Sequence, residues 1–288
     1  MKKVLFALIA TVTALVFDMP ALHAAADNQL VARQKINLSG RQRMLSQRMS
    51  AAACIAMTGL DGGERAQIAQ TAHDEFDTVL SGLRDGNADL GLPSESSADV
   101  RMALDTVVET WRVVSPPVQQ LASGYATISA ITQIMQNNNE LLRQSNAVVQ
   151  QIVAKYGGAS IAADMAKAID IAGRQRMLSQ RMVKAACFVF VQIGDTDTRG
   201  ELASAIELFD SSLAQLMNGD AARFVAAPPT LAVAQQLSHV YEIWQPFRRQ
   251  LEDMASGARS GPQDLLAIAA AGDELLKETN KAVLRYVE

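Results

Sequence analysis

The sequence is poor in the residues from which metal sites, nucleic-acid surfaces and most active sites are built. It contains two cysteines, three histidines and 5% aromatic residues in 288. No Cys or His spacing matches a metal site, so we expect no metal. The net charge of -4 offers no basic surface to nucleic acid. Nucleophile-elbow, phosphate-loop and dinucleotide motifs are also missing, so we expect neither an enzyme nor a cofactor.

The first 26 residues have the pattern of a secretory signal peptide. Lys2 and Lys3 precede an apolar run over residues 4–17, and three alanines at residues 24–26 offer a cleavage site before Asp27. The apolar run is shorter than the roughly 20 residues that a membrane span needs. No later apolar run is long enough either. We therefore expect a periplasmic protein without stable membrane insertion, and the alternative is an uncleaved anchor.

A ten-residue string occurs twice in the chain. The string GRQRMLSQRM at residues 40–49 recurs letter for letter at residues 173–182, an offset of 133. The same offset, with a slip of one near the end, relates further pairs: Cys54 and Cys187, Trp111 and Trp244, Asn146 and Asn280. Self-similarity at a fixed period is typical of repeated structural units. We therefore predict two tandem modules, residues 27–156 and residues 157–288.

Both modules have the composition and periodicity of helices. Helix-forming residues dominate, apolar positions lie three and four apart, and period-2 alternation is rare. Glycine and proline mark breaks at residues 61–63, 86–97, 124, 157–158, 194–200, 219–229 and 257–262. These breaks leave four helices in each module, and short connections favour antiparallel neighbours. The predicted fold class is all-α, with two tandem antiparallel four-helix bundles.

The repeated string divides into two faces when it is placed on a helix at about 100° per residue. One face is apolar, and we expect it in the bundle core. The other face is a small-polar stripe, which consists of Gly40, Arg43, Ser46, Gln47, Ser50 and Cys54. Exposed helix faces are usually filled with Glu and Lys, whereas Gly and Ser let another backbone approach closely. The stripe therefore predicts an arginine held between packed helices.

An arginine in such a place suggests an anion site. Its guanidinium is a rigid fork of donors that suits planar oxyanions, and Ser and Gln can add hydrogen bonds. If the two stripes meet, Arg43 faces Arg176, and an anion between them would relieve their repulsion. The predicted ligand-binding residues are Arg43, Arg176, Gly40, Gly173, Ser46, Ser179, Gln47 and Gln180. The alternative is that each arginine pairs with a carboxylate of its own module.

The strings at residues 36–49 and 169–182 resemble the signature of the PilJ-type domain, the N-terminal sensory domain of type IV pili methyl-accepting chemotaxis transducers. They are also similar to the periplasmic domain of NarX-type nitrate sensor kinases. The resemblance implies a four-helix bundle, extracytoplasmic sensing and a small planar anion, with nitrate or nitrite held by one arginine from each of two helices. Those arginines correspond to Arg43 and Arg176. We expect the two modules to reproduce this arrangement as an intramolecular pseudo-dimer.

Cys54 and Cys187 occupy equivalent positions about three turns beyond the arginines. A pseudo-twofold packing of the modules would bring them together, and an oxidising compartment permits a disulfide. A disulfide requires Cα atoms within about 7 Å, and small buried thiols are also common. The sequence leaves both alternatives open.

These inferences favour a periplasmic ligand-binding or sensor-accessory protein. We expect it to capture a small anion, nitrate or nitrite first, and to present the bound state to a membrane-bound sensor or transducer. The alternative is a helical interaction protein that binds no ligand. In that case the small-polar stripe would pack against a partner helix in a chemotaxis-transducer or pilus-associated complex.

Overall fold

The computed structural model describes residues 19–60, 63–124, 127–158, 161–192, 198–258 and 261–288. Within these ranges the secondary structure consists of eight α-helices, one short 3-10 helix and isolated bridge contacts. The helices are α1 (Met19–Thr58), α2 (Glu64–Asp85), α3 (Ala98–Ala122), α4 (Ile128–Tyr156), α5 (Ala163–Val191), α6 (Thr198–Asn218), η1 (Ala221–Arg223), α7 (Leu231–Ser256) and α8 (Pro262–Val287). The predicted all-α class is confirmed, and the predicted breaks fall at the ends of these helices.

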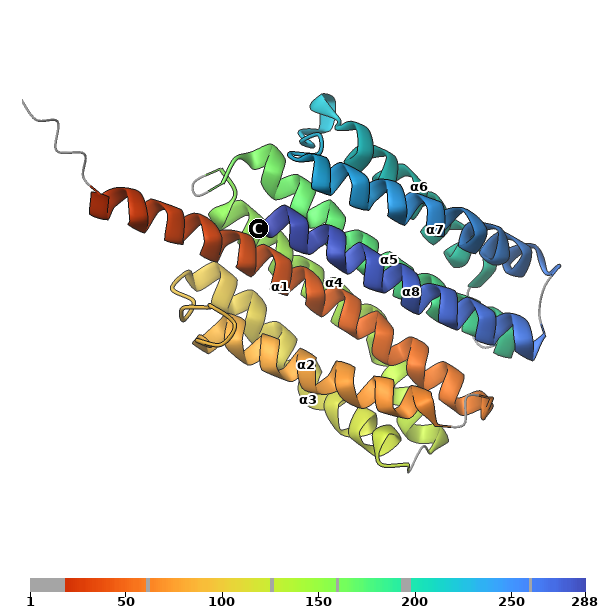
Figure 1. Cartoon of the computed structure of the whole chain (residues 1–288). Coiled ribbons are helices and arrows are strands. Elements are labelled where there is room, and N and C mark those ends of the chain that lie inside the picture. The colour runs from red at the N-terminus through yellow and green to blue at the C-terminus, as the bar shows by residue number, and fades with distance from the viewer. Residues whose placement is uncertain (1–18, 61–62, 125–126, 159–160, 193–197, 259–260) are drawn as a thin grey trace, which may run out of the picture.

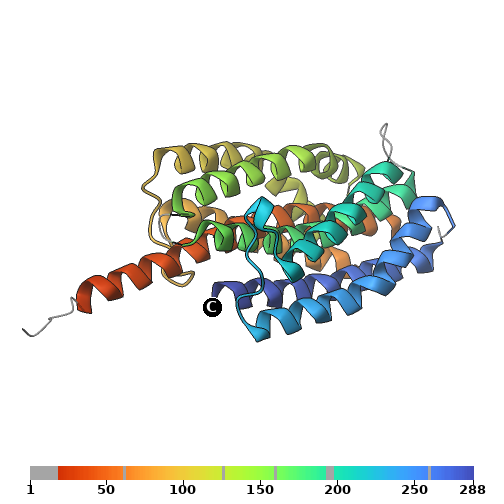
Figure 2. The same ribbon diagram turned by 90° about the horizontal axis from the view of Figure 1, so that it is seen from above.

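The helices form two four-helix bundles that lie side by side (Figure 1). In the first bundle, α1 contacts α2 and α4, and α3 closes the ring opposite α1; α5 to α8 repeat this arrangement. The bundles meet along α1 and α5, which share the most extensive contact among the described helices, and Figure 2 shows both helices running through the middle of the molecule. The predicted fold of two packed bundles is confirmed.

Each bundle is held together by a tryptophan that makes equivalent contacts in the two bundles. The indole N–H of Trp111 donates to Asp77 of α2, and that of Trp244 donates to Asp210 of α6, both at 2.9 Å. Each indole also packs on a phenylalanine one residue before its acceptor, with ring centroids 4.3 Å apart. An aromatic side chain of this kind supplies a large buried surface and a polar end that is satisfied. The tryptophans therefore attach α3 to α2 and α7 to α6.

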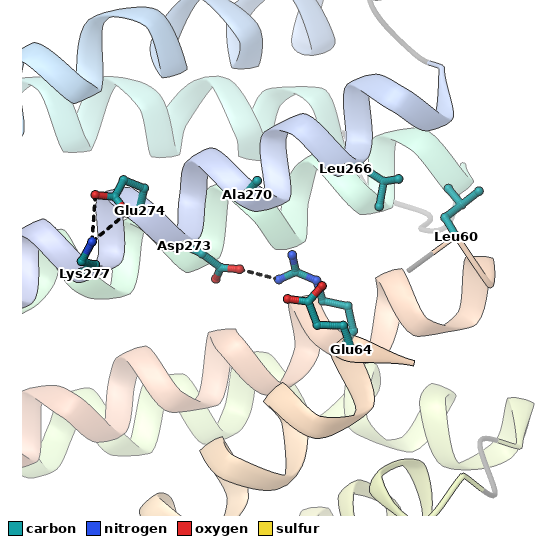
Figure 3. Close-up of a pocket in the computed structure, with 8 residues that line it drawn as sticks. Leu60, Glu64, Leu266, Ala270, Asp273, Glu274 and Lys277 are labelled. Atoms are coloured by element: carbon teal, nitrogen blue, oxygen red, sulfur yellow. Dashed lines mark hydrogen bonds and ion pairs between the residues drawn. The ribbon is translucent and has the colours of Figure 1, made fainter. Parts of the chain in front are cut away.

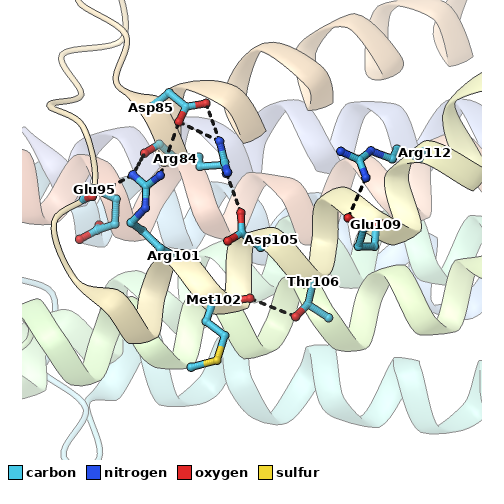
Figure 4. A network of polar contacts seen from close by, with 9 residues as sticks. All are labelled: Arg84, Asp85, Glu95, Arg101, Met102, Asp105, Thr106, Glu109 and Arg112. Carbon is cyan, nitrogen blue, oxygen red and sulfur yellow. Dashed lines mark hydrogen bonds and ion pairs between the residues drawn. The ribbon is translucent and has the colours of Figure 1, made fainter.

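The linker between α2 and α3 is fixed by a tight turn and by polar contacts (Figure 4). Gly86 ends α2 at φ 92°, and a Cβ added to it would lie 2.8 Å from the backbone nitrogen of Ser94, so the turn requires glycine. Arg84 Nε donates to Asp105 of α3 at 2.6 Å. Arg101 donates to the carbonyl oxygens of Arg84 and Glu95, both at 3.2 Å.

The N-terminal half of α1 and the end of α8 lie at the same end of the molecule (Figure 1). Arg33 Nη1 donates to the carbonyl oxygen of Tyr286 at 3.4 Å. Residues 1–18 of the expected signal peptide lie outside the described residues, and the expected cleavage site at residues 24–26 falls within α1. Among the described helices, none combines the length and the apolar character that a membrane span requires.

Candidate functional site

Helices α1 and α5 approach each other most closely at the glycines of the repeated string. A Cβ added to Gly40 would lie 3.9 Å from the Cα of Gly173, and a Cβ added to Gly173 would lie 3.9 Å from the Cα of Gly40. Each added Cβ would also lie 3.4 Å from Nη2 of Arg43 and 3.5 Å from Nη2 of Arg176. The two glycines therefore leave a small space that both guanidinium groups border.

Arg43 is buried and reaches across to the second bundle. Its Nη1 donates to Oδ1 of Asn146 on α4 at 3.1 Å, and its Nη2 donates to the carbonyl oxygen of Asp170 on α5 at 3.2 Å. The same Nη2 lies 2.7 Å from Oδ1 of Asp170, which is itself buried. Arg43 is therefore paired with a carboxylate, but that carboxylate belongs to the other predicted module and not to its own.

Arg176 occupies the equivalent position with different partners. Its Nη1 donates to Oδ1 of Asn280 on α8 at 3.1 Å, and its Nη2 donates to the carbonyl oxygen of Asn37 on α1 at 3.0 Å. The side chain is 1% exposed, and no carboxylate of the described residues lies within 4.0 Å of it. The alternative of carboxylate pairing within each module therefore does not describe Arg176.

One N–H group of each arginine forms no hydrogen bond with the described residues. The Nε–H of Arg43 and that of Arg176 are buried and have no hydrogen-bond partner among the described residues. In a guanidinium group Nε and Nη2 lie on one edge, which is the edge that commonly binds an oxyanion through two parallel hydrogen bonds. Buried polar groups are almost always satisfied, so these two donors require an explanation. The Nε–H of Arg33 and that of Arg41 are in the same state, whereas only Arg43 and Arg176 also border the space at the glycines with Nη2.

The electrostatic surroundings of the two arginines differ. Burial lowers the pKa of Arg43, and the Asp170 carboxylate opposes this shift. Burial also lowers the pKa of Arg176, to about 9; the positive charges of Arg41 and Arg43 lower it further, and the Glu75 carboxylate opposes the shift. Arg41 itself forms an ion pair with Glu75. The space beside Gly40 and Gly173 is therefore bordered by Arg43, which is ion-paired with Asp170, and by Arg176, which forms no ion pair with the described residues.

The serines and glutamines of the repeated string contact other groups. The hydroxyls of Ser46 and Ser179 donate to the carbonyl oxygens of Arg43 and Arg176, both at 2.8 Å. The side-chain amide of Gln47 donates to Asn138 of α4, and that of Gln180 donates to the carbonyl oxygen of Gly272 on α8, both at 3.1 Å. The structure thus brings together the two glycines and the two arginines. The serines and glutamines support the helices around them.

Three polar positions outside the repeated string complete this region, and sequence reasoning did not include them in the site. Asn146 and Asn280 accept from the arginines, and Asp170 neutralises one of them. Asn146 and Asn280 align in the repeat, and position 170 differs from its counterpart at 37 within the similar strings. Comparison of the two copies could therefore have found all three.

A small cleft includes Asn280, the hydrogen-bond partner of Arg176. It has a volume of about 290 Å³, lies between α8 and the pair α1 and α2, and is lined by Arg41, Arg48, Lys277 and Asn280 among others. Next to it, a cleft of about 630 Å³ contains Asp273 (Figure 3). The Asp273 carboxylate pairs with Arg48 at 2.7 Å and with Arg65 at 2.8 Å. Because Asn280 accepts from Arg176, the smaller cleft ends one side chain away from the buried guanidinium.

Cys54 and Cys187 form a disulfide, with their Cα atoms 6.2 Å apart. The bond joins α1 to α5 about three turns beyond the arginines and so crosslinks the two bundles. The small-polar stripe of α1 is buried along the same contact. Arg43 and Cys54 of the stripe contact α5, whereas Gln47 contacts α4, so in the described part of the chain this stripe packs against helices of the same chain.

Comparison with known proteins identifies the family of the chain. The family model described as the type IV pili methyl-accepting chemotaxis transducer N-terminal region, the PilJ family, matches residues 25–150 and 160–271. The chain belongs to the PilJ family. Methyl-accepting chemotaxis protein McpN of Pseudomonas aeruginosa is 34% identical over 131 residues, which make up 46% of this chain and 23% of McpN. The chain thus matches less than a quarter of that relative's length. PilJ membership indicates a role in sensory signalling, and domains of this family are typically non-catalytic.

Proposed function

We propose that the chain is a periplasmic sensory protein that captures a small monovalent anion between α1 and α5. Nitrate and nitrite are the first candidates, and the bound state is presented to a membrane-bound sensor or transducer. The observation that carries this proposal is the state of Arg176. Its guanidinium is buried and lacks a carboxylate within 4.0 Å among the described residues, and its Nε–H has no acceptor there. A buried charge in this state is strongly stabilised by an anion.

The space beside the two glycines is narrow, so an anion that enters it must be small and must move the two guanidinium groups apart. The added Cβ atoms at Gly40 and Gly173 are in ordinary van der Waals contact with the guanidinium nitrogens and with the opposite backbone. A small planar oxyanion suits the Nε and Nη2 edge of Arg176 because two of its oxygens can accept at once. The similarity of the repeated strings to nitrate sensor kinases favours nitrate and nitrite over other planar anions.

The cleft between α1 and α8 is the path by which we expect the anion to arrive. Arg41, Arg48 and Lys277 line it together with the carboxylates of Glu75 and Asp273, so anions would move along a path of mixed charge. Asn280 separates the end of the cleft from Arg176, and a change in its side-chain rotamer would open the way. A bound anion would then alter contacts of both α1 and α8, which also meet where Arg33 donates to the carbonyl oxygen of Tyr286.

The disulfide supports a location outside the cytoplasm. Structural disulfides form and persist in oxidising compartments such as the periplasm. The lysines and apolar run of residues 2–17 fit the same location. Chemotaxis transducers act at the membrane, so we propose that the partner is a membrane-bound transducer that contacts the end where α1 and α8 meet.

Thermal unfolding of the purified chain tests the anion site. Nitrate, nitrite, chloride, sulfate and acetate are compared at constant ionic strength, and a ligand at 100 times its Kd should add about 2.7 kcal/mol. Nitrate or nitrite should raise the midpoint, and Arg176→Met and Arg43→Met should remove the shift. Arg112→Met is the matched control because Arg112 is exposed on α3. If none of the anions shifts the wild-type midpoint, the proposal is wrong.

A further inference from the structure

Positions 37 and 170 break the equivalence of the two halves of the site. Both residues offer their backbone carbonyl oxygen to the arginine of the opposite helix, at 3.0 Å for Asn37 and 3.2 Å for Asp170. Their side chains differ, because one is an amide and the other a carboxylate. Both side chains are buried, so solvent does not screen this difference.

The Asp170 carboxylate is held by two arginines. Its Oδ1 lies 2.7 Å from Nη2 of Arg43, and its Oδ2 lies 3.4 Å from Nη2 of Arg174 one turn along α5. The corresponding Oδ1 of Asn37 is buried and has no hydrogen-bond partner among the described residues. A carboxylate is itself a planar oxyanion, so Asp170 places beside Arg43 the same chemical group that a small ligand would offer.

We propose that Asp170 is a tethered anion that occupies the Arg43 half of the site, so that the chain takes a single monovalent anion at the Arg176 half. This inference rests on the proposed function. A site with an amide at both positions would present two uncompensated guanidinium groups and would favour an added anion more strongly. Asp170 neutralises one of them and competes with any ligand that approaches Arg43. Asp170 therefore determines how tightly the site binds an anion, and it directs that anion to Arg176.

Two exchanges between the halves separate this role from a merely structural one. Asp170→Asn places an amide beside each arginine, so neither guanidinium has an ion-pair partner. Nitrate should then bind about tenfold more tightly, the equivalent of about 1.4 kcal/mol. Asn37→Asp makes both halves alike and compensated. It should raise the unfolding midpoint in anion-free buffer, because it pairs Arg176, and it should abolish the response to nitrate.

Isothermal titration with sodium nitrate, in chloride-free buffer, measures the affinities of the wild type and both variants, and circular dichroism verifies their folding. If the wild type binds nitrate and a folded Asp170→Asn variant binds it equally or less tightly, the role of Asp170 is overturned and the proposed function stands. If only Asp170→Asn binds, Asp170 occupies the site and the proposed function of the native chain fails. If neither binds, both ideas fail. Should Asp170→Asn not fold, Asn37→Asp decides, because unchanged nitrate affinity in that variant contradicts the inference.

Discussion

Gly40 of α1 and Gly173 of α5 pack against each other with room for one further carbon atom on either side. A Cβ added to Gly40 would lie 3.4 Å from Arg43 Nη2 and 3.9 Å from the Cα of Gly173, which are ordinary contact distances. Both glycines lie inside helices, where glycine costs about 0.5–1 kcal/mol relative to alanine. Their presence therefore favours a functional use of the space over a purely steric requirement.

We expect Gly40→Ala to separate folding from anion binding. The free energy of unfolding should stay the same or rise by about 0.5–1 kcal/mol, because the methyl group fits and the unfolded chain loses freedom. Nitrate affinity should fall more than about tenfold, because the methyl group occupies the space beside both guanidinium groups. Urea unfolding and nitrate titration on the same preparation measure the two effects.

Gly272→Ala provides the contrast for this test. A Cβ added to Gly272 would collide with Cγ2 of Val183, so this variant should lose stability. Gly173→Ala should behave as Gly40→Ala does, because the corresponding distances are the same. Unchanged nitrate affinity in both Gly40→Ala and Gly173→Ala would place the anion elsewhere.

The fold could be predicted from the sequence because the signals for helices and helix ends are local and occur in both copies of the repeat. Glycine and proline breaks mark helix ends, and an apolar period of three to four marks helices, so the eight helices follow from the pattern alone. The side chains beside Arg43 and Arg176 were less accessible to prediction. Ser46 and Gln47 share the helix face of Arg43, yet a face is broad enough to contact two neighbouring helices. Gln47 contacts α4, whereas Arg43 also reaches α5.

The charge balance of the site also depended on packing. The alternative prediction pairs Arg43 with a carboxylate of its own module, but the carboxylate that pairs with it lies across the contact between α1 and α5. Asp170 and Asn37 stand at equivalent positions of two nearly identical strings. Only the crossing of these helices reveals that each residue faces the arginine of the other copy.

The disulfide between Cys54 and Cys187 should contribute substantially to stability. It closes a loop of 133 residues, and crosslinks of this length stabilise folded proteins by about 2–5 kcal/mol, mainly by restricting the unfolded chain. We expect reductant to lower the urea midpoint of the wild type by a corresponding amount. The double variant Cys54→Ala with Cys187→Ala should unfold near the midpoint of the reduced wild type and should not respond to reductant. Equal midpoints with and without reductant in the wild type would contradict a crosslink.

Lys184 should make stability depend on alkaline pH. Its side chain is 2% exposed, its Nζ donates to Oδ1 of Asn138 at 3.0 Å, and the equivalent position in the first copy is Ala51. Burial lowers the pKa of Lys184 from 10.5 to about 8, with Arg181 adding to the shift and Glu201 opposing it. Between these two values the unfolded chain binds more protons than the folded chain, so stability rises with pH.

Lys184→Met removes this dependence. The variant should be more stable than the wild type at pH 7, by about 1–3 kcal/mol, because an apolar side chain of similar length needs no desolvation of charge. The gain should shrink as pH approaches 10. Lys277→Met is the control because Lys277 is exposed on α8. Urea unfolding at both pH values measures the difference, and an equal gain at each pH would show that Lys184 does not titrate in this range.

Lys35, Glu95 and Tyr156 form a buried polar cluster that only the first bundle has, since Ala168 and Pro228 replace the first two in the second copy. Lys35 Nζ lies 2.7 Å from Glu95 Oε2, and the Tyr156 hydroxyl donates to Glu95 Oε1 at 2.7 Å. The cluster joins the linker before α3 to α1 and α4. Glu95→Gln would leave the Lys35 ammonium buried without a counter-charge, and we expect a loss of about 3–5 kcal/mol.

The same cluster predicts a sensitivity to acid. Burial raises the pKa of Glu95, but hydrogen bonds from Lys35, the Ser97 N–H and Tyr156 together outweigh it, so the pKa lies below its ordinary value of 4.5. The stabilisation is therefore complete above pH 4.5 and is lost as the pH falls through the lower folded-state value. Urea unfolding from pH 6 to pH 3 should show that the difference in the free energy of unfolding between wild type and Glu95→Gln decreases toward low pH. Glu109→Gln, at an exposed ion pair with Arg112, should show almost no gap at any pH. If the difference in stability for Glu95→Gln does not change with pH, packing of the linker, and not the charge of Glu95, holds the linker against α1.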